Sequence, residues 1–476
     1  MNWIRLFRWR MRLLRQLATR SGRLFVVVIT LVIASGLYVQ FLATGSPPAI
    51  SPDRPCTYSM YVNGSSFLAV NCQTGTIDYS ATSATTTIQN VVNQITANGG
   101  TAIFQAGTWP LGSSGISISG TSSNWEIGFL PGTSWTYSGS GYALSISAAT
   151  RGSIKNFDIV RPYIVVSSNT GGGISINGGY LFTITEPYIQ SQAVAIDLDN
   201  LNTAKIIGGG YISNPSNPQA IGSVGIRLAK TGYTNNLDIS LNQVSGYERG
   251  IQLGSNTFAV DVEQLDVHDT YFSSNKVAIQ IYTVKNLMVR QDYFENQASA
   301  SVNVTNTGSM CPSFVDISNN VFIENPGVNN INIPNGNYLF NLRAVHNNWA
   351  GGNLVLGNLV TGGIVETNGI TGSVTISSPS VRRIWTNPDP EAGQVTGIST
   401  GSLGLRTATV TYPRAYPSGV TPIVQLTLQS PTDSNSRFGG IWASAVTNTG
   451  FTINIAITTS GVAGSTVSCT WIATSY

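Results

Sequence analysis

The stretch that decides the fold is LDVHDTYF, residues 265–272, because the chain repeats it in altered forms. The other copies are FDIVRPYI (157–164), FTITEPYI (182–189), KIIGGGYI (205–212), LDISLNQV (237–244), LMVRQDYF (287–294), VDISNNVF (315–322) and, more loosely, LRAVHNNW (342–349). The third residues of successive copies lie from 22 residues apart (Val267 to Val289) to 32 apart (Ile207 to Ile239). A repeat of variable length predicts stacked coils whose connecting loops differ in size.

A second segment follows most copies and alternates apolar with polar residues: GISIN (173–177), AIDLD (195–199), GIRLA (225–229), GIQLG (250–254), AIQIY (278–282), SVNVT (301–305) and NINIP (330–334). A period of two predicts strands with one buried face. We expect the eighth residues of the copies to form one buried ladder, namely Ile189, Ile212, Val244, Phe272, Phe294, Phe322 and Trp349. We expect the sixth residues to bond at a bend and to one another, namely Asn242, Thr270, Asp292, Asn320 and Asn347.

This pattern resembles the right-handed parallel β-helix of the pectate-lyase-like superfamily over about residues 80–390, and its sixth residues resemble that family's internal asparagine ladder. The segment TTTIQNVVNQITANGGTAIFQAGTWPL (85–111) is similar to the family's entry, where an amphipathic helix caps the core. One face of this helix carries Ile88, Val91, Val92 and Ile95. The resemblance implies an all-β fold, and it leaves the activity open.

The N-terminal region predicts a membrane anchor. Seven arginines, Arg5, Arg8, Arg10, Arg12, Arg15, Arg20 and Arg23, precede the uncharged apolar run at residues 24–43, which is long enough to span a bilayer. Positive charge before the run places the N-terminus in the cytoplasm and residues 44–476 outside, as a single-pass protein of the cell membrane. A cleavable signal peptide is the alternative, although its apolar region usually has about 7 to 15 residues.

Composition narrows the partners. The chain has 24 Lys+Arg and 21 Asp+Glu, a formal charge of +3, which argues against nucleic acid. Charged residues make up 9% of the chain, whereas a soluble domain has about 25%. Such a neutral polar surface suits an extracellular scaffold. The expected segments are 1–23 basic and cytoplasmic, 24–43 transmembrane, 44–80 linker and small N-terminal region, 81–392 β-helix, 393–404 linker, and 405–476 β-sandwich.

Four cysteines and two sequons bear on an exterior location. In an oxidising compartment a local disulfide between Cys56 and Cys72 is the simplest of three connectivities, and Cys311 and Cys469 stay unassigned. Asn63 and Asn303 begin Asn-x-Ser/Thr sequons, which matter if the host glycosylates them.

The outward positions of the repeat suggest a site. The second residues bring together Asp238, Asp266, Met288 and Asp316, and the fourth residues Ser240, His268, Arg290 and Ser318. Because parallel strands lie about 4.8 Å apart, we expect Asp266, His268 and Arg290 to form one cluster with Asp238 beneath. Its chemistry would be proton abstraction beside a sugar carboxylate, with His268 or Asp266 as base while Arg290 neutralises the anion.

Asp266-Val267-His268 also resembles the Asp-Pro-His motif of alginate C5-epimerases, with valine in place of proline. That resemblance implies acid and base roles for Asp266 and His268. The alternative, which the sequence favours, is a solvated face with an ion pair across coils. Asp292 is expected to be a bend residue.

Other polar residues give weaker site predictions. Asp197 faces Arg227 one coil on, with Asp199 beside it, and we expect a surface pair with a lesser claim to bind substrate. His268 and His346 fall in different columns, which argues against zinc. No cofactor is expected, although calcium among Asp238, Asp266 and Asp316 stays open.

The C-terminal region has a different pattern of short alternating strands: ATVTYP (408–413), PIVQLTLQS (422–430), GGIWASAVTNTGFTINIAI (439–457) and STVSCTWIA (465–473). They predict a small antiparallel β-sandwich. It resembles the H-type lectin fold and the tips of phage tail fibres, where Arg437 matches a sugar-binding arginine and Trp442 is a second candidate. The alternative pairs Arg437 at a trimer interface and packs Trp442 against the β-helix.

These features together predict an anchored exterior protein that binds or attaches to surface polysaccharide. One alternative is an enzyme acting on acidic glycans, as a lyase, C5-epimerase or glycoside hydrolase. A second alternative is a structural stalk or adhesin-like spike, assembled as a homotrimer.

Overall fold

The computed structural model describes residues 56–476, apart from gaps at 217, 257–261, 307–311, 368–369, 371, 385–390, 413–414, 417–420 and 475–476. The basic segment 1–23 and the apolar run 24–43 lie outside the described residues, so the membrane anchor stays a prediction. Within the described part, no helix has the length and hydropathy needed to cross a bilayer.

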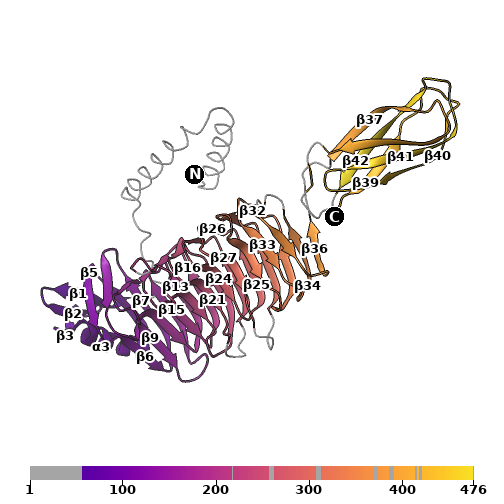
Figure 1. The fold of residues 1–476 in the computed structure, drawn as a ribbon. Coiled ribbons are helices and arrows are strands. Elements are labelled where there is room, and N and C mark those ends of the chain that lie inside the picture. The colour runs from indigo at the N-terminus through magenta and orange to yellow at the C-terminus, as the bar shows by residue number, and fades with distance from the viewer. Residues whose placement is uncertain are drawn as a thin grey trace, which may run out of the picture. The chain divides into compact units, whose positions relative to one another are not determined.

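The chain winds through three parallel sheets, and most coils give one strand to each (Figure 1). The first sheet has the order β3 (Ile77–Ala81), β2 (Ser66–Asn71), β1 (Cys56–Asn63), β4 (Gly100–Phe104), β7 (Ser122–Phe129), β10 (Ile154–Val160), β13 (Gly179–Thr185), β16 (Asn202–Ile207), β19 (Thr234–Ile239), β22 (Val262–His268), β25 (Lys285–Arg290), β28 (Ser313–Ser318), β31 (Leu339–Ala344), β34 (Val360–Glu366) and β36 (Val381–Ile384).

The second sheet stacks shorter strands, in the order β5 (Gly107–Gly112), β8 (Thr133–Tyr137), β11 (Tyr163–Val166), β14 (Tyr188–Gln190), β17 (Tyr211–Ser213), β20 (Gln243–Ser245), β23 (Tyr271–Ser273), β26 (Tyr293–Glu295), β29 (Val321–Ile323) and β32 (Asn348–Trp349). The third sheet runs β6 (Ile116–Gly120), β9 (Tyr142–Ala148), β12 (Gly172–Asn177), β15 (Val194–Asp199), β18 (Val224–Leu228), β21 (Arg249–Leu253), β24 (Val277–Ile281), β27 (Ala300–Val304), β30 (Asn329–Ile333), β33 (Asn353–Leu356) and β35 (Val374–Ile376). The predicted parallel β-helix is confirmed.

The vertical register of the repeat is confirmed by the aromatic ladder. Phe272, Phe294 and Phe322 stack with ring centroids 5.1 and 4.7 Å apart, and Trp349 continues the stack at 4.5 Å. All four side chains are buried. Rings that overlap face to face in this way keep their contact through every coil.

The copy at residues 205–212 is shifted by one residue from its predicted alignment with its neighbours. Ile206, and not Ile207, pairs with Ile184 on one side and Ile239 on the other. The bend that follows holds three glycines, where the preceding copy has Glu186 and Pro187, so it contains one more residue. Gly208 and Gly209 both have positive φ, which lets the chain absorb that residue.

The sixth residues form the predicted polar ladder inside a bend. The backbone N–H groups of Thr270, Asp292 and Asn320 donate to the side chains of Asp292, Asn320 and Asn347 at 2.8, 2.9 and 2.9 Å. Asn242 departs from the prediction, because it is exposed, and the backbone of the neighbouring Leu241 bonds to Thr270 instead.

A second ladder at the next bend was not predicted. The backbone N–H groups of Tyr247, Asn275 and Gln297 donate to the side chains of Asn275, Gln297 and Glu324. Both ladders satisfy backbone groups that would otherwise be buried without partners.

The N-terminal end of the core is closed by α3 (Ala84–Asn98), which buries the predicted face of Ile88, Val91, Val92 and Ile95. The side chain of Ser83 caps the helix by accepting a hydrogen bond from the Thr86 N–H. The preceding strands β1 to β3 pair antiparallel and join the first sheet through β4. Residues 56–81, which include most of the expected small N-terminal region, therefore extend the first sheet of the β-helix.

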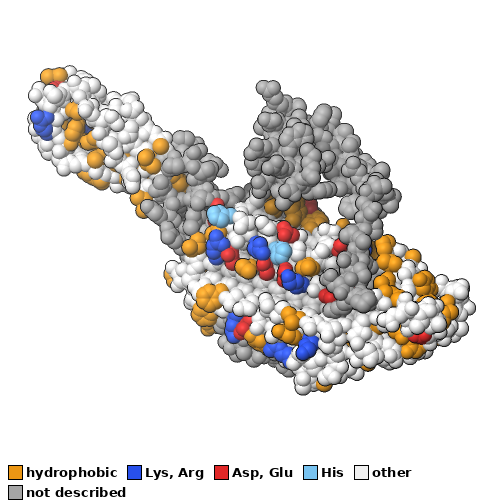
Figure 2. Space-filling model, turned by 180° about the vertical axis from the view of Figure 1, so that it is seen from behind, with side chains coloured by type: hydrophobic (Ala, Val, Ile, Leu, Met, Phe, Trp, Pro, Cys, Tyr) orange, Lys and Arg blue, Asp and Glu red, His pale blue; other side chains and the backbone are white. Residues whose placement is uncertain are grey.

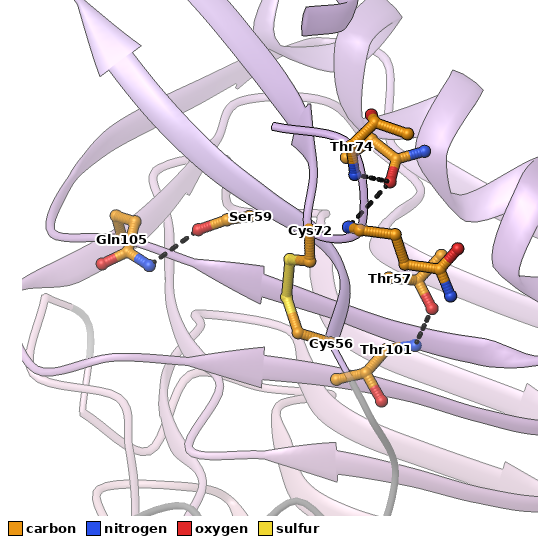
Figure 3. Close-up of a disulfide and its surroundings, with 9 residues drawn as sticks. Cys56, Thr57, Ser59, Cys72, Thr74, Thr101 and Gln105 are labelled. Carbon is orange, nitrogen blue, oxygen red and sulfur yellow. Dashed lines mark hydrogen bonds between the residues drawn. A yellow bond between two sulfur atoms is a disulfide. The ribbon is translucent and has the colours of Figure 1, made fainter. Parts of the chain in front are cut away.

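The predicted disulfide is confirmed: Cys56 at the start of β1 is bonded to Cys72, just after β2 (Figure 3). Cys311 lies outside the described residues, and Cys469 is a buried free thiol. The sequon residue Asn63 is exposed at the turn between β1 and β2. Asn303 lies within β27, where its carboxamide donates to Gln280 and accepts from Asn332 at 2.8 Å each.

The C-terminal region has two antiparallel three-stranded sheets with a core of their own, as expected for a small β-sandwich. One sheet has the order β37 (Glu391–Ser399), β42 (Thr466–Thr474), β39 (Ile423–Leu428), and the other β38 (Gly404–Thr411), β41 (Gly450–Thr459), β40 (Arg437–Ser444). Because β37 pairs with β42, residues 391–399 belong to this module and differ from the expected β-helix end and linker.

Candidate functional site: a groove along the first parallel sheet

A column of left-handed residues bends nine consecutive coils of the first sheet, from β7 to β31, at one level. It consists of Asn124, Asn156, Leu181, Thr203, Asn236, Gln264, Asn286, Phe314 and Asn341, all with φ between 48° and 60°. The strand register steps over these positions: Lys155 pairs with Tyr180 and Phe157 with Phe182, for example, on either side of the bend. Such bulges bend strands out of plane. A hollow therefore follows the column along the coil stack.

This hollow is an open groove of about 650 Å³, which we call the sheet groove. Five consecutive coils line it, through Thr203, Ala204, Lys205, Asn236, Leu237, Asp238, Gln264, Leu265, Asp266, Asn286, Leu287, Met288, Phe314 and Asp316. Acidic, basic and histidine side chains gather in a band on this face of the β-helix (Figure 2). Predicted site residues Asp238 and Asp266 thus lie in a concave surface.

The predicted columns are in register. Asp238 pairs with Asp266, Asp266 with Met288, and His268 with Arg290. The Arg290 guanidinium donates two parallel hydrogen bonds to Asp266, from Nε to Oδ1 at 3.0 Å and from Nη2 to Oδ2 at 2.5 Å. This bidentate geometry is the strong form of a charge-assisted pair. The hydrogen bonds and charge of Asp266 also raise the pKa of Arg290.

His268 lies between two carboxylates. Its Nε2 is 2.9 Å from Asp238 Oδ1, and its Nδ1 is 2.9 Å from Asp269 Oδ2. Partial burial lowers the pKa of His268, but the hydrogen bonds to Asp269 and Asp238 and the charge of Asp266 outweigh it, so the net pKa is raised. The arrangement favours an imidazolium that donates from both nitrogens. Lys205 Nζ completes the cluster, 3.8 Å from Asp238 Oδ2.

The groove continues past the charged cluster onto an apolar surface. Met288 and Phe314 are exposed at its end, and a neighbouring hollow of about 410 Å³ shares Phe314 and adds Arg343 and Ile364. Arg343 Nη1 bonds to Asp316 Oδ2 at 2.7 Å. The surface thus presents ion pairs and exposed apolar side chains in alternation.

The three aspartates named for calcium are each engaged by other side chains: Asp238 by His268 and Lys205, Asp266 by Arg290, and Asp316 by Arg343. Across the residues that the structure describes, no group of three or more His, Cys, Asp or Glu side chains has the geometry to hold a metal ion.

Asp197 and Arg227 are paired as predicted, but the pair is largely buried. Their side chains are 10% and 18% exposed, and Arg227 Nη2 lies 2.5 Å from Asp197 Oδ2. The Tyr142 hydroxyl donates to the same carboxylate at 2.6 Å, and burial together with that carboxylate raises the pKa of Tyr142. Asp199 accepts hydrogen bonds from the backbone of Thr231 and Gly232. The expected surface pair is therefore a structural one.

In the C-terminal module, Arg437 and Trp442 are both exposed on β40. Arg437 donates to the backbone carbonyls of Ser434 and Ser436. Their role in sugar binding stays a prediction.

Sequence reasoning missed Lys205, Asp269 and Phe314 as members of the site. A signal was present, because Asn156, Asn236, Asn286 and Asn341 each directly precede the first residue of a phrase. Asparagine tolerates the left-handed region better than most residues. A recurrent asparagine at that place marks the bend that forms the groove.

Comparison with known proteins gives likeness in structure only. No family model and no curated protein matches the sequence. A mutant tailspike protein of E. coli bacteriophage HK620, solved in complex with a pentasaccharide, is similar at a TM-score of 0.40 and 11% identity, over 82% of this chain and 90% of that one.

Two further structures show the same kind of likeness. The tailspike protein gp49 of Pseudomonas phage LKA1 has a TM-score of 0.33 and 12% identity, over 76% of this chain and 68% of that one. The surface protein and adhesin PfbA of Streptococcus pneumoniae has a TM-score of 0.39 and 10% identity, over 63% of this chain and 92% of that one. By its own three parallel sheets and its C-terminal antiparallel pair, the chain is a right-handed parallel β-helix followed by a small β-sandwich.

Proposed function

We propose that this chain is an exterior polysaccharide-binding protein, and that the sheet groove holds a linear glycan along the coil stack. The observation that supports this most is the open groove crossing five coils, with charged hydrogen-bonding pairs beside exposed Met288 and Phe314. A sugar ring has hydroxyls at its rim and apolar C–H groups on its faces. A surface with convergent polar groups and apolar side chains suits such a ligand.

The state of the charged cluster favours binding over catalysis. Proton abstraction needs a base with a free lone pair near the substrate. Both ring nitrogens of His268 are directed at carboxylates, and Asp266 is held bidentately by Arg290. The enzyme alternative would have to break one of these pairs before it could act.

We also propose that residues 24–43 anchor the protein, with the β-helix outside the cell, on the strength of their length, lack of charge and preceding arginines. The β-sandwich, through Arg437 and Trp442, is a second proposed glycan contact, and assembly into a homotrimer is part of the same proposal. Protease accessibility of intact cells tests the orientation, and sedimentation of residues 54–476 tests the assembly.

The binding proposal is tested with residues 54–476 on a glycan array, alongside an ultraviolet assay for unsaturated sugars released from uronate polymers. We expect binding without turnover, and at least tenfold weaker binding in Arg290→Ala. The matched control is Arg249→Ala on the third sheet, which should bind normally. Turnover that disappears in His268→Ala would instead establish the enzyme alternative, and binding to no glycan would favour the stalk.

A further inference from the structure

Phe314 occupies a backbone position that suits it poorly. It stands in the left-handed column with a φ of 54°, where five of the nine residues are asparagine. A bulky side chain at positive φ is strained, whereas asparagine is tolerated there. Strained positions of this kind cluster at functional sites.

Burial does not compensate for this strain. The side chain of Phe314 is 59% exposed, so little of its ring is removed from water. Leu181 occupies the same column five coils before Phe314 and is 41% exposed, but it does not line the groove. Phe314 and Leu181 therefore both have a left-handed backbone conformation and an exposed side chain. They differ in that only Phe314 lines the groove.

Phe314 lies where two hollows meet. It lines both the sheet groove and the neighbouring hollow of about 410 Å³. Exposed Met288 lies on the preceding coil and exposed Phe340 on the next. The Asp316–Arg343 pair lies on the same two coils as Phe314 and Phe340, with a carboxylate and a guanidinium at 2.7 Å. An apolar platform is thus bordered by an acceptor and a donor.

We propose that Phe314 is a stacking platform for one pyranose ring of the bound glycan, with Asp316 and Arg343 placed to meet the hydroxyls of that ring. This inference rests on the proposed binding function. The apolar face of a pyranose covers the exposed ring and removes it from water, while the rim of the sugar keeps its polar partners. A wholly apolar occupant would leave Asp316 and Arg343 without ligand contacts.

The test compares Phe314→Asn with Leu181→Asn in the full-length chain, on an array of defined hexasaccharides and by thermal unfolding. Asparagine relieves the backbone strain at both positions and removes little buried surface. We expect both variants to unfold at or above the wild-type temperature. Phe314→Asn should weaken the apparent Kd of the strongest array ligand at least tenfold, while Leu181→Asn stays within twofold and Phe314→Tyr retains binding.

The outcomes separate this inference from the binding proposal. If the wild type binds and Phe314→Asn binds equally well, the platform is overturned and the binding proposal stands. If Phe314→Asn alone unfolds at a lower temperature, the ring has a structural role and the inference is overturned. If the wild type binds no hexasaccharide, both proposals fail.

Discussion

The inside and the outside of the same coils stack different kinds of side chain. Inside, Phe272, Phe294 and Phe322 place identical rings on one another. Outside, one column mixes charged and apolar side chains: Asp238 is followed by Asp266 and then by Met288, and the two carboxylates are bonded to His268 and Arg290. At one coil step of about 4.8 Å, like aromatic rings gain contact, whereas the like carboxylates of Asp238 and Asp266 each have a basic side chain bonded to them. The interior of the β-helix is therefore repetitive in sequence, while its surface is variable and available for function.

The largest expected effect comes from breaking the inner stack at its centre. Phe294→Ala removes a fully buried ring between two others, and we expect a loss of about 3–5 kcal/mol in unfolding free energy. Urea denaturation measures it, with exposed Met288→Ala as the control that should change little. Equal urea midpoints for the two variants would contradict the larger contribution of the buried ring to stability.

Two ion pairs sharpen the comparison, because one is buried and one is exposed. Arg227→Ala leaves the buried Asp197 carboxylate without its cation, and we expect a loss of about 3 kcal/mol. Arg290 is 41% exposed, and Arg290→Ala should cost less than about 1 kcal/mol, an effect that shrinks with added salt. Denaturation at two salt concentrations measures both, and similar losses would refute the assignment of the first pair to the core.

Asp292 is a carboxyl in a ladder whose next two members, Asn320 and Asn347, are amides. Asn320 and Asn347 each donate Nδ2 to a backbone carbonyl of the preceding coil at 2.8 Å. Asp292 Oδ2 is buried and has no hydrogen-bond partner among the described residues. Burial raises the pKa of Asp292 well above its usual 3.8. A raised pKa in the folded state means that stability is full below pH 3.8 and is lost as the pH rises through the folded pKa.

Asp292→Asn should therefore stabilise the fold. In place of the unpartnered Oδ2, an asparagine has an Nδ2 group that can donate a hydrogen bond at every pH, as Asn320 and Asn347 do. We expect a gain of about 1–3 kcal/mol at pH 8 that shrinks on acidification. Thermal unfolding across pH measures it, and the reverse change Asn320→Asp should destabilise. A gain that is independent of pH would contradict the raised pKa of Asp292.

The smallest effect concerns the charge of His268. His346→Gln leaves His268 as the sole histidine, so proton NMR gives its pKa directly, and we expect a value above the ordinary 6.5. Asp238→Asn removes one hydrogen-bonded carboxylate and should lower that pKa. Since the folded pKa is raised, the stability from these contacts is full below pH 6.5 and is lost as the pH rises through the folded pKa. An unchanged pKa in Asp238→Asn would exclude the contact.

Much of the site could be predicted from the sequence because each coil stacks directly on the preceding one, so aligned residues of the repeat become neighbours. Once Phe272 and Phe294 are aligned, Asp266 and Arg290 must lie one coil apart on the outside. Which carboxylate an arginine binds depends on side-chain rotamers, and the sequence repeat does not specify these. The sequence pattern placed His268 in one cluster with Asp266, Arg290 and Asp238; in the structure its ring bonds to Asp238 and also to Asp269, which the pattern did not assign to the site.

The sequence by itself determined the coil, the inner ladders at its sixth and eighth positions, the capping helix and the outward columns, since each follows from period-two alternation and a repeated phrase. Only the tertiary structure decided the three-glycine slip at Ile206, the inclusion of β37 in the sandwich, the burial of Asp197 with Arg227, and the groove beneath Phe314. Loop lengths, strand pairing across distant segments and the bending of strands at left-handed residues depend on contacts between coils, which local sequence does not contain.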